Sequence, residues 1–320
     1  MGLHYSVNTV ILFVVFGGTV LLKRNFDTRD NVDGLHRSAE CVQETIEPLM
    51  VGNLWQFWDR FPYVVNKCSP SLKDVKLGEF PNSDEFKYHF LPLRKLPNCS
   101  IISLGIGKDV KAEKKMKSVL PGCQFYGADP VDEDNNELFS SFGKFFNMAV
   151  GDRNGSFRSY VLEEIYRYQE VLTIDLATFI RTNIKQQTID QLMVDIEHAE
   201  YPVFPFIEEK GQLDDWGIHV CQVFVYSHLR FTSFVFQINI EIHSPTDEDR
   251  ETFASFLRKN FVTHQWIFVN SEIHPFFKHI RLFMVNGRNR ECLKRYFLTD
   301  NKKRVTSKTR DVHIEDHLFQ

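Results

Sequence analysis

The chain has 320 residues, of which 43% are hydrophobic and 25% are charged, and its formal net charge is −4 with a pI near 6.3. This length allows one α/β domain of about 200 to 250 residues with extensions. Because the chain lacks the basic footprint of nucleic-acid-binding proteins, we expect no nucleic-acid partner.

An uncharged segment at residues 6–22 is followed by Lys23 and Arg24. Its length is near the lower limit for a membrane-spanning helix and slightly exceeds a signal-peptide core. We predict a signal anchor or signal peptide at 1–22, a stalk at 23–45, and a protein that is membrane-anchored in the secretory pathway or secreted. Because Lys23 and Arg24 follow the segment and basic residues favour the cytosolic side of a membrane, an orientation with the rest of the chain in the cytosol stays open.

The six cysteines show neither close pairs nor metal-site spacing, so we predict no metal. Cys41 and Cys68 precede the predicted sheet, where a disulfide could stabilise an extension in an oxidising compartment. Cys99, Cys123 and Cys221 border or lie within predicted strands and are expected to be buried thiols.

An N-terminal helical extension is predicted at 46–97. Leu54, Phe57, Trp58 and Phe61 recur there at helical spacing, which predicts a helix that packs on the domain. A role of this aromatic stripe as a lid over a substrate is the less favoured alternative.

Residues 98–130 have the pattern of a strand, a glycine turn, a helix and a second strand. The apolar run at 101–104 is typical of a strand buried on both faces. Gly105 and Gly107 follow, and glycine allows both a left-handed backbone and close approach of backbone N–H groups to a ligand.

Asp129 is expected at the carboxyl end of the second strand, beside the glycine turn. A carboxylate there commonly accepts hydrogen bonds from the two hydroxyls of a ribose. The dinucleotide fingerprint requires a glycine where this chain has Val110, which disfavours a nicotinamide oxidoreductase. A cofactor with a ribose and no phosphate, such as S-adenosyl-L-methionine, fits better.

A second acidic position follows the apolar run that starts at Gln191. Asp195 and Glu197 are expected where a buried parallel strand reaches the carboxyl edge of the sheet, the edge at which α/β proteins place their chemistry. The alternative is that such carboxylates only cap the next helix. We prefer that alternative for Glu200 and a functional site for Asp195 and Glu197.

The remaining periodic segments extend the α/β pattern to residue 300, and 301–320 is predicted to be a tail. Strands are expected at 145–150, 171–174, 219–222, 238–243, 265–270 and 280–286, and helices at 176–182 and 247–260.

The segment 223–237 interrupts this pattern with continuous strand-like sequence of unusual length. Its residues are compatible with codons that begin with GT, include pyrimidine-rich phenylalanine codons and end with CAG, as an intron does. We hypothesise that residues 223–237 are encoded by a retained intron. Without them, Gln222 would be followed directly by Ile238 within a single strand. The alternative is a hairpin insertion.

Five ordered blocks give the chain a resemblance to the FkbM-type family of S-adenosylmethionine-dependent methyltransferases. They are SLGIGKDVKAE, FYGADP, MAVGDRNGS, VDIEHAEY and INIEIH, which begin at Ser103, Phe125, Met148, Val194 and Ile238. The resemblance implies an α/β domain at 98–300 with a seven-stranded, mostly parallel, Rossmann-like methyltransferase sheet. It also implies helices on both faces and one antiparallel strand near the edge.

The resemblance also implies site residues. Gly105 and Gly107 would line the methionine and ribose side of the cofactor with Glu113 behind them, Asp129 would bind the ribose, Asp152 would lie near the adenine, and Asp195 and Glu197 would face the methyl donor and acceptor. His198 stands where the family usually has glycine, and an imidazole there would narrow the pocket, supply a base or mark lost activity.

The expected activity is O-methylation of a small molecule or glycan. Glu197, His243 and His198, in that order, are candidates for the base that removes the acceptor proton. The alternative is a catalytically inactive, methyltransferase-like binding domain. The sequence makes no prediction of oligomeric state.

Overall fold

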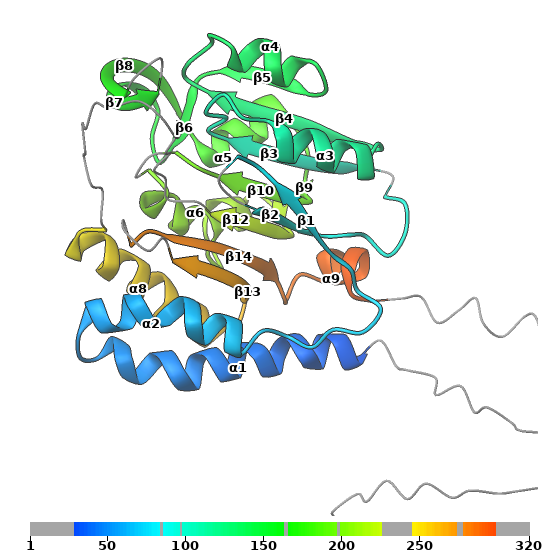
Figure 1. The fold of residues 1–320 in the computed structure, drawn as a ribbon, viewed down its shortest axis with the longest axis vertical. Helices are drawn as coiled ribbons and strands as arrows, with labels where there is room; N and C mark the ends of the chain where they lie inside the picture. Colours follow the sequence, from blue (N-terminus) through cyan, green and yellow to red (C-terminus); the bar gives the residue numbers. More distant parts are fainter. Residues whose placement is uncertain are drawn as a thin grey trace, which may run out of the picture.

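The computed structural model describes residues 29–83, 86–96, 98–162, 166–196, 199–225, 245–273 and 278–298. Within them, seven strands form the main sheet (Figure 1). In spatial order these are β13 (Trp266–Ile273), β14 (Ile280–Asn286), β12 (Gln222–Val225), β10 (Gln191–Val194), β3 (Cys99–Leu104), β4 (Cys123–Asp129) and β5 (Lys144–Asn147).

Six of these seven strands run in the same direction. The pairs of β5 with β4, β4 with β3, β3 with β10 and β10 with β12 are parallel, whereas β14 pairs antiparallel with both β12 and β13. The prediction of a mostly parallel sheet with an antiparallel strand near the edge is therefore confirmed. We call the edge at which the parallel strands end the carboxyl edge and the opposite one the amino edge.

Apolar layers cover both faces of the sheet because the central strands are apolar throughout and successive side chains alternate in direction. Ile102 and Leu104 of β3 pack in one cluster, and Ile101 packs in the other. The first cluster includes side chains from α5 (Leu176–Phe179) and α8 (Asp247–Thr263), and the second includes side chains from α3 (Lys111–Val119) and α9 (Arg290–Tyr296).

Residues 29–45 do not form the predicted stalk. They belong to α1 (Arg29–Met50), whose Leu35, Val42 and Ile46 are fully buried. An apolar stripe on a helix needs a partner surface, and α1 finds it on α2 (Leu54–Lys67) and β13 (Figure 1). In α2, the predicted aromatic stripe is confirmed as a core-facing helix surface, with Phe57 and Phe61 fully buried.

The predicted helical extension is helical only in part, because β1 (Leu77–Pro81) and β2 (Phe86–Phe90) form an antiparallel hairpin there. Two glutamine side chains from the main sheet hold this hairpin. Gln191 Nε2 donates to the Tyr88 carbonyl oxygen at 2.8 Å, and Gln222 Oε1 accepts from the Phe90 N–H at 2.7 Å. A second layer thus covers the face of the sheet that carries α3 and α9.

The strand predicted at 145–150 divides between two sheets. Its first part is β5, whereas β6 (Ala149–Gly151) joins a separate sheet with β8 (Tyr166–Asp175) and β7 (Gly155–Leu162). β7 and β8 form a long antiparallel hairpin, and β8 includes the short strand predicted at 171–174. In the remaining described residues, η1 (Ile180–Ile184), β9 (Thr188–Ile189), η2 (Tyr201–Val203), α4 (Asn135–Ser140), α6 (Phe204–Ile207), α7 (Gln212–Asp215) and β11 (His219–Val220) are short connecting elements.

The first three residues of the suspected intron, Val223 to Val225, occupy β12 between β10 and β14 and are buried. Residues 226–244 lie outside the described residues, as does the strand predicted at 238–243. The structure therefore does not test whether residues 223–237 are a retained intron or a hairpin insertion, and both stay predictions.

All six cysteines are paired, as Cys41–Cys68, Cys99–Cys123 and Cys221–Cys292. The first pair, between α1 and the end of α2, agrees with the sequence prediction. The expectation of buried thiols at Cys99, Cys123 and Cys221 was wrong. Cys99 and Cys123 are register partners at the starts of the neighbouring strands β3 and β4, and Cys221 meets Cys292 of α9.

None of the helices in the described ranges is long and apolar enough to cross a membrane. The predicted signal anchor at 1–22 and the tail at 301–320 lie outside the described residues.

Candidate active site at the carboxyl edge

The glycine turn, Asp129 and Asp195 meet at the carboxyl edge because they follow or end three adjacent parallel strands. The turn follows β3, Asp129 ends β4, and Asp195 follows β10. This position, between strands whose connections leave on opposite sides, is where open α/β sheets bind ligands.

Gly105 is required by the close approach of the neighbouring strand. Its φ is +75°, and a Cβ at this position would lie 1.7 Å from the Asp195 carbonyl oxygen. The Asp195 N–H in turn donates to the Leu104 carbonyl oxygen at 2.9 Å. Without a side chain at residue 105, the ends of β3 and β10 can approach each other closely.

Asp129 is buried and faces the glycine turn. Its Oδ2 accepts hydrogen bonds from the N–H groups of Ile106 at 2.8 Å and Gly107 at 3.2 Å, and its Oδ1 accepts one from Val131 at 2.8 Å. Burial raises the pKa of Asp129, whereas these three hydrogen bonds favour the carboxylate and oppose the shift.

The backbone donors of the glycine turn are mostly used within the protein, which differs from the expectation that they would face a ligand. Besides the two bonds to Asp129, the Gly105 N–H donates to the Ala128 carbonyl oxygen and the Lys108 N–H donates to Asn135 Oδ1. Asp129 and Asn135 therefore fix the conformation of the turn. The sequence did not single out Asn135, since an asparagine in a polar connection carries no periodic signal.

Asp195 is half-buried at the end of β10, as predicted. Glu200 is buried, and its Oε1 accepts from the Ile196 N–H at 2.8 Å. This bond ties Glu200 to the residue that follows Asp195, and the Glu200 side chain makes no capping hydrogen bond to η2. Glu197, His198 and His243 lie outside the described residues, so their roles stay predictions.

Asp152 lies in the exposed turn after β6, with its Oδ1 3.7 Å from Arg153 Nε. Its expected place near the adenine stays a prediction.

Glu113 lies behind the glycine turn in a buried ion pair. Its Oε1 is 2.8 Å from Lys87 Nζ of β2 and accepts a hydrogen bond from the Ser103 hydroxyl at 3.2 Å. The turn of the β1–β2 hairpin also reaches α3, where Asn82 Oδ1 accepts from the Ala112 N–H. The hairpin thus supports the helix that follows the glycine turn.

A cavity of about 330 Å³ is lined from Pro130 onward, directly after Asp129, which is not itself part of the lining. It lies between the ends of β4 and β5 and the hairpin strand β8, and its lining includes Val131, Asn147 and Met148. Two further cavities, of about 180 and 280 Å³, lie around Trp266 at the amino edge, remote from the predicted site residues. We assign function to the carboxyl edge because the glycine turn and the carboxylates converge there.

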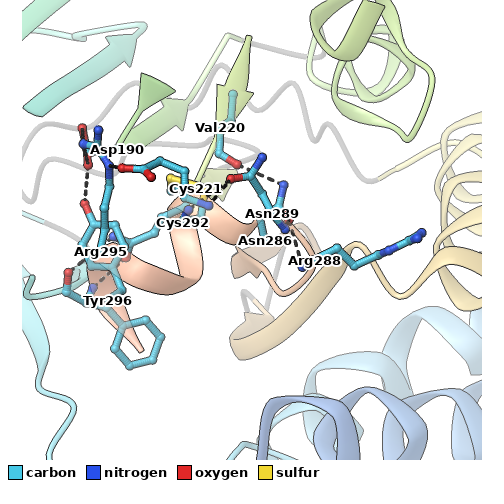
Figure 2. The surroundings of a disulfide bond; sticks show 12 residues. Asp190, Val220, Cys221, Asn286, Arg288, Asn289, Cys292, Arg295 and Tyr296 are labelled. Atoms are coloured by element: carbon cyan, nitrogen blue, oxygen red, sulfur yellow. Dashed lines mark hydrogen bonds and ion pairs between the residues drawn. A yellow bond between two sulfur atoms is a disulfide. The ribbon is translucent and has the colours of Figure 1, made fainter. Parts of the chain in front are cut away.

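Asp190 centres a buried polar cluster at the amino edge, beside the Cys221–Cys292 disulfide (Figure 2). Its carboxylate accepts hydrogen bonds from Arg295 Nη1 at 2.9 Å, the Tyr296 hydroxyl at 2.7 Å and the Ser100 N–H at 2.9 Å. Burial raises the pKa of Asp190, and the Arg295 guanidinium opposes that shift. This cluster anchors α9 to the sheet.

Among the residues that the structure describes, no group of three or more His, Cys, Asp or Glu side chains is placed to hold a metal ion.

The fold and the carboxyl-edge site are consistent with a methyltransferase, and residues 40–296 match the family model of the Methyltransferase FkbM domain. The chain therefore belongs to the FkbM methyltransferase family, and this membership suggests methyltransferase activity. The match starts within α1, so the segment before the sheet falls within the matched region.

The chain is also similar to Uncharacterized protein C28H8.7 of Caenorhabditis elegans, with 21% identity over 208 residues. The aligned region covers 65% of this chain and 59% of the relative.

Proposed function

We propose that this protein transfers the methyl group of S-adenosyl-L-methionine to an oxygen atom of a small molecule or glycan. The observation that carries the proposal is the junction of the glycine turn with Asp129 and Asp195 at the carboxyl edge, in a chain that belongs to the FkbM family. Family membership supports the reaction class, and the junction supports the place.

The residues present fit a nucleoside-containing cofactor. Gly105 has no side chain, so the backbone around it stays compact, and Asp129 is a buried acceptor. The residues that follow Asp129, from Pro130 on, line a cavity of about 330 Å³. Asp129 Oδ1 accepts one hydrogen bond from the described residues, and a carboxylate oxygen has capacity for a second donor such as a ribose hydroxyl. Gly105 and Gly107 would contact the methionine side.

The cofactor would supply an electrophilic methyl group on a sulfonium. The protein then mainly has to orient the donor and acceptor, exclude water and receive the acceptor's proton. Asp195 directly follows the strand next to the glycine turn and would face the reacting groups. Glu197, followed by His243 and His198, remains our candidate for the base.

One observation favours the alternative of an inactive binding domain. Asp129 and Asn135 already occupy the N–H groups of Ile106, Gly107 and Lys108. A turn saturated in this way offers fewer donors to a ligand, so cofactor binding and turnover have to be tested separately.

We further propose that the protein resides in the secretory pathway or is secreted, with membrane attachment through the segment at 1–22. The pairing of all six cysteines supports an oxidising compartment.

The test combines calorimetric titration with S-adenosyl-L-methionine and detection of S-adenosylhomocysteine during incubation with secretory-pathway extracts. Asp129→Asn is more informative than Asp129→Ala because the amide keeps one oxygen acceptor for the glycine turn. We expect Asp129→Asn to weaken cofactor binding roughly tenfold, the cost of one charged hydrogen bond. Glu137→Gln, an exposed carboxyl-to-amide change on α4, should bind like the parent.

Cofactor binding without product in any extract would favour the inactive domain. Equal binding by Asp129→Asn and the parent would contradict our assignment of the ribose site.

A further inference from the structure

Arg250, in the first turn of α8, is a fully buried cation with incomplete hydrogen bonding. Its Nη1 donates to Asp247 Oδ1 at 3.0 Å, and the Asp247 side chain is 77% exposed. No described residue accepts a hydrogen bond from its Nε or Nη2. The guanidinium therefore carries buried donors that its own helix does not satisfy.

Such a group is costly to keep. Burying N–H groups without acceptors lowers stability, and the penalty is larger when the donor is charged. Burial accordingly lowers the pKa of Arg250. Unpaired buried polar groups in folded proteins are rare and call for a ligand, a bound water or a functional reason.

Trp55 covers one face of this guanidinium. The Arg250 Cζ lies 3.2 Å from the centre of a Trp55 ring, whereas the Trp55 side chain is 48% exposed. Trp55 is the second residue of α2, on the solvent side of the contact between α2 and α8. The half-exposed indole ring therefore lies against a buried cation, with part of its own surface in solvent.

The pair lies toward the carboxyl edge. α8 ends at Thr263, three residues before β13 starts at the amino edge, and its 17 residues span about 25 Å. Its first turn therefore returns to the carboxyl edge, and Figure 1 shows the beginnings of α2 and α8 at the same end of the molecule. α8 also packs on η2, which begins at Tyr201, six residues after Asp195.

We propose that Arg250 and Trp55 form a binding site for an anionic group: a carboxylate, phosphate or sulfate. The guanidinium fork suits the paired oxygens of such groups, and the indole ring can pack on the carbon skeleton that carries them. Resting on the proposed function, this group belongs to the methyl acceptor, which would make the acceptor an acidic molecule. The anion site itself does not depend on methyl transfer.

The test is a titration of the whole protein, without cofactor, monitored by tryptophan fluorescence. The probes are sodium sulfate, sodium phosphate and sodium glucuronate, with sodium chloride at equal ionic strength and glucose as controls. We expect a saturable change with one or more of the three anions and none with chloride or glucose. Whether sulfate, phosphate or glucuronate gives it identifies the anionic group.

Two arginine variants on α8 separate a site from a general charge effect. Arg250→Met keeps an apolar stem and should weaken anion binding at least roughly tenfold. Arg258→Met removes an exposed charge from the same helix and should bind like the parent. Because Arg250→Met removes a buried unsatisfied charge, it should fold and melt no lower than Arg258→Met by more than a few degrees.

Three results would overturn the proposal: a response to chloride equal to that of the anions, anion binding by Arg250→Met equal to that of the parent, or an unchanged fluorescence response in Trp55→Phe. Absence of methyl transfer would not affect these results, so failure of the proposed function and failure of the anion site are distinguishable.

Discussion

Gly105 and Asp195 lie backbone to backbone at the carboxyl edge, with the Asp195 carbonyl oxygen 1.7 Å from the place a Cβ of residue 105 would take. The glycine turn is therefore shaped by two strands that are distant in the sequence. The end of β10 lies directly beside the turn, and in the proposed function this contact would bring the cofactor and acceptor sites together.

Gly105→Ala should disrupt this junction. The new methyl group would collide with the Asp195 backbone, and the residue would be held at a φ of +75°. We expect a loss of about 3 kcal/mol or more in the free energy of unfolding, measured in urea. Gly122→Ala is the matched control, because nothing lies within 4 Å of its Cβ position and a change below about 1 kcal/mol is expected. Equal losses of stability in the two variants would contradict this prediction, because they would mean that the ends of β3 and β10 make room for the added methyl group at no cost in free energy.

The buried Lys87–Glu113 ion pair should show strong coupling. Lys87→Met leaves the Glu113 carboxylate buried without its cation, which should cost about 3 to 5 kcal/mol in the free energy of unfolding. Lys87→Met combined with Glu113→Leu should recover most of that loss, because no uncompensated charge remains. The check is a double-mutant cycle in urea, and additive losses would mean that the two residues act independently.

His89 should make the protein sensitive to acid. Burial lowers its pKa to about 4, below the ordinary value of 6.5, and its Nδ1 hydrogen bonds to Gln191 Oε1. The unfolded chain therefore binds a proton between pH 6.5 and 4 that the folded chain does not. The stabilisation is complete above pH 6.5 and declines as the pH falls toward 4, by about 3 kcal/mol. This loss is measured by urea unfolding of the parent and of His89→Gln at pH 7, 5.5 and 4. If the free energy of unfolding of the two proteins changes with pH in the same way, His89 is not the cause.

The disulfides give a direct chemical prediction. Under denaturing, non-reducing conditions, thiol titration should find no free thiol among the six cysteines. Replacing both Cys221 and Cys292 by serine opens a link across 71 residues and should lower the free energy of unfolding by about 4 kcal/mol. Two or more reactive thiols in the parent would contradict the pairing.

Local patterns in the sequence predicted the central elements well. The apolar run at 101–104 lies in a strand, the aromatic stripe of α2 faces the core, and the strand at 280–286 has the predicted bounds. These features depend on periodicity and burial, which are local. α1 was missed because its sparse apolar residues lie among many polar ones, and its amphipathic stripe gains a partner only through α2 and β13.

The sequence by itself determined the α/β class, the strands on either side of the glycine turn and the acidic residue that ends the second of them, because each is encoded in contiguous residues. Only the tertiary structure decided that Cys99 pairs with Cys123 and Cys221 with Cys292, that Asp129 accepts hydrogen bonds from the N–H groups of the turn, and that Trp55 lies over Arg250. These relationships join residues far apart in the chain, and packing and burial select them among many combinations that local patterns leave equally possible.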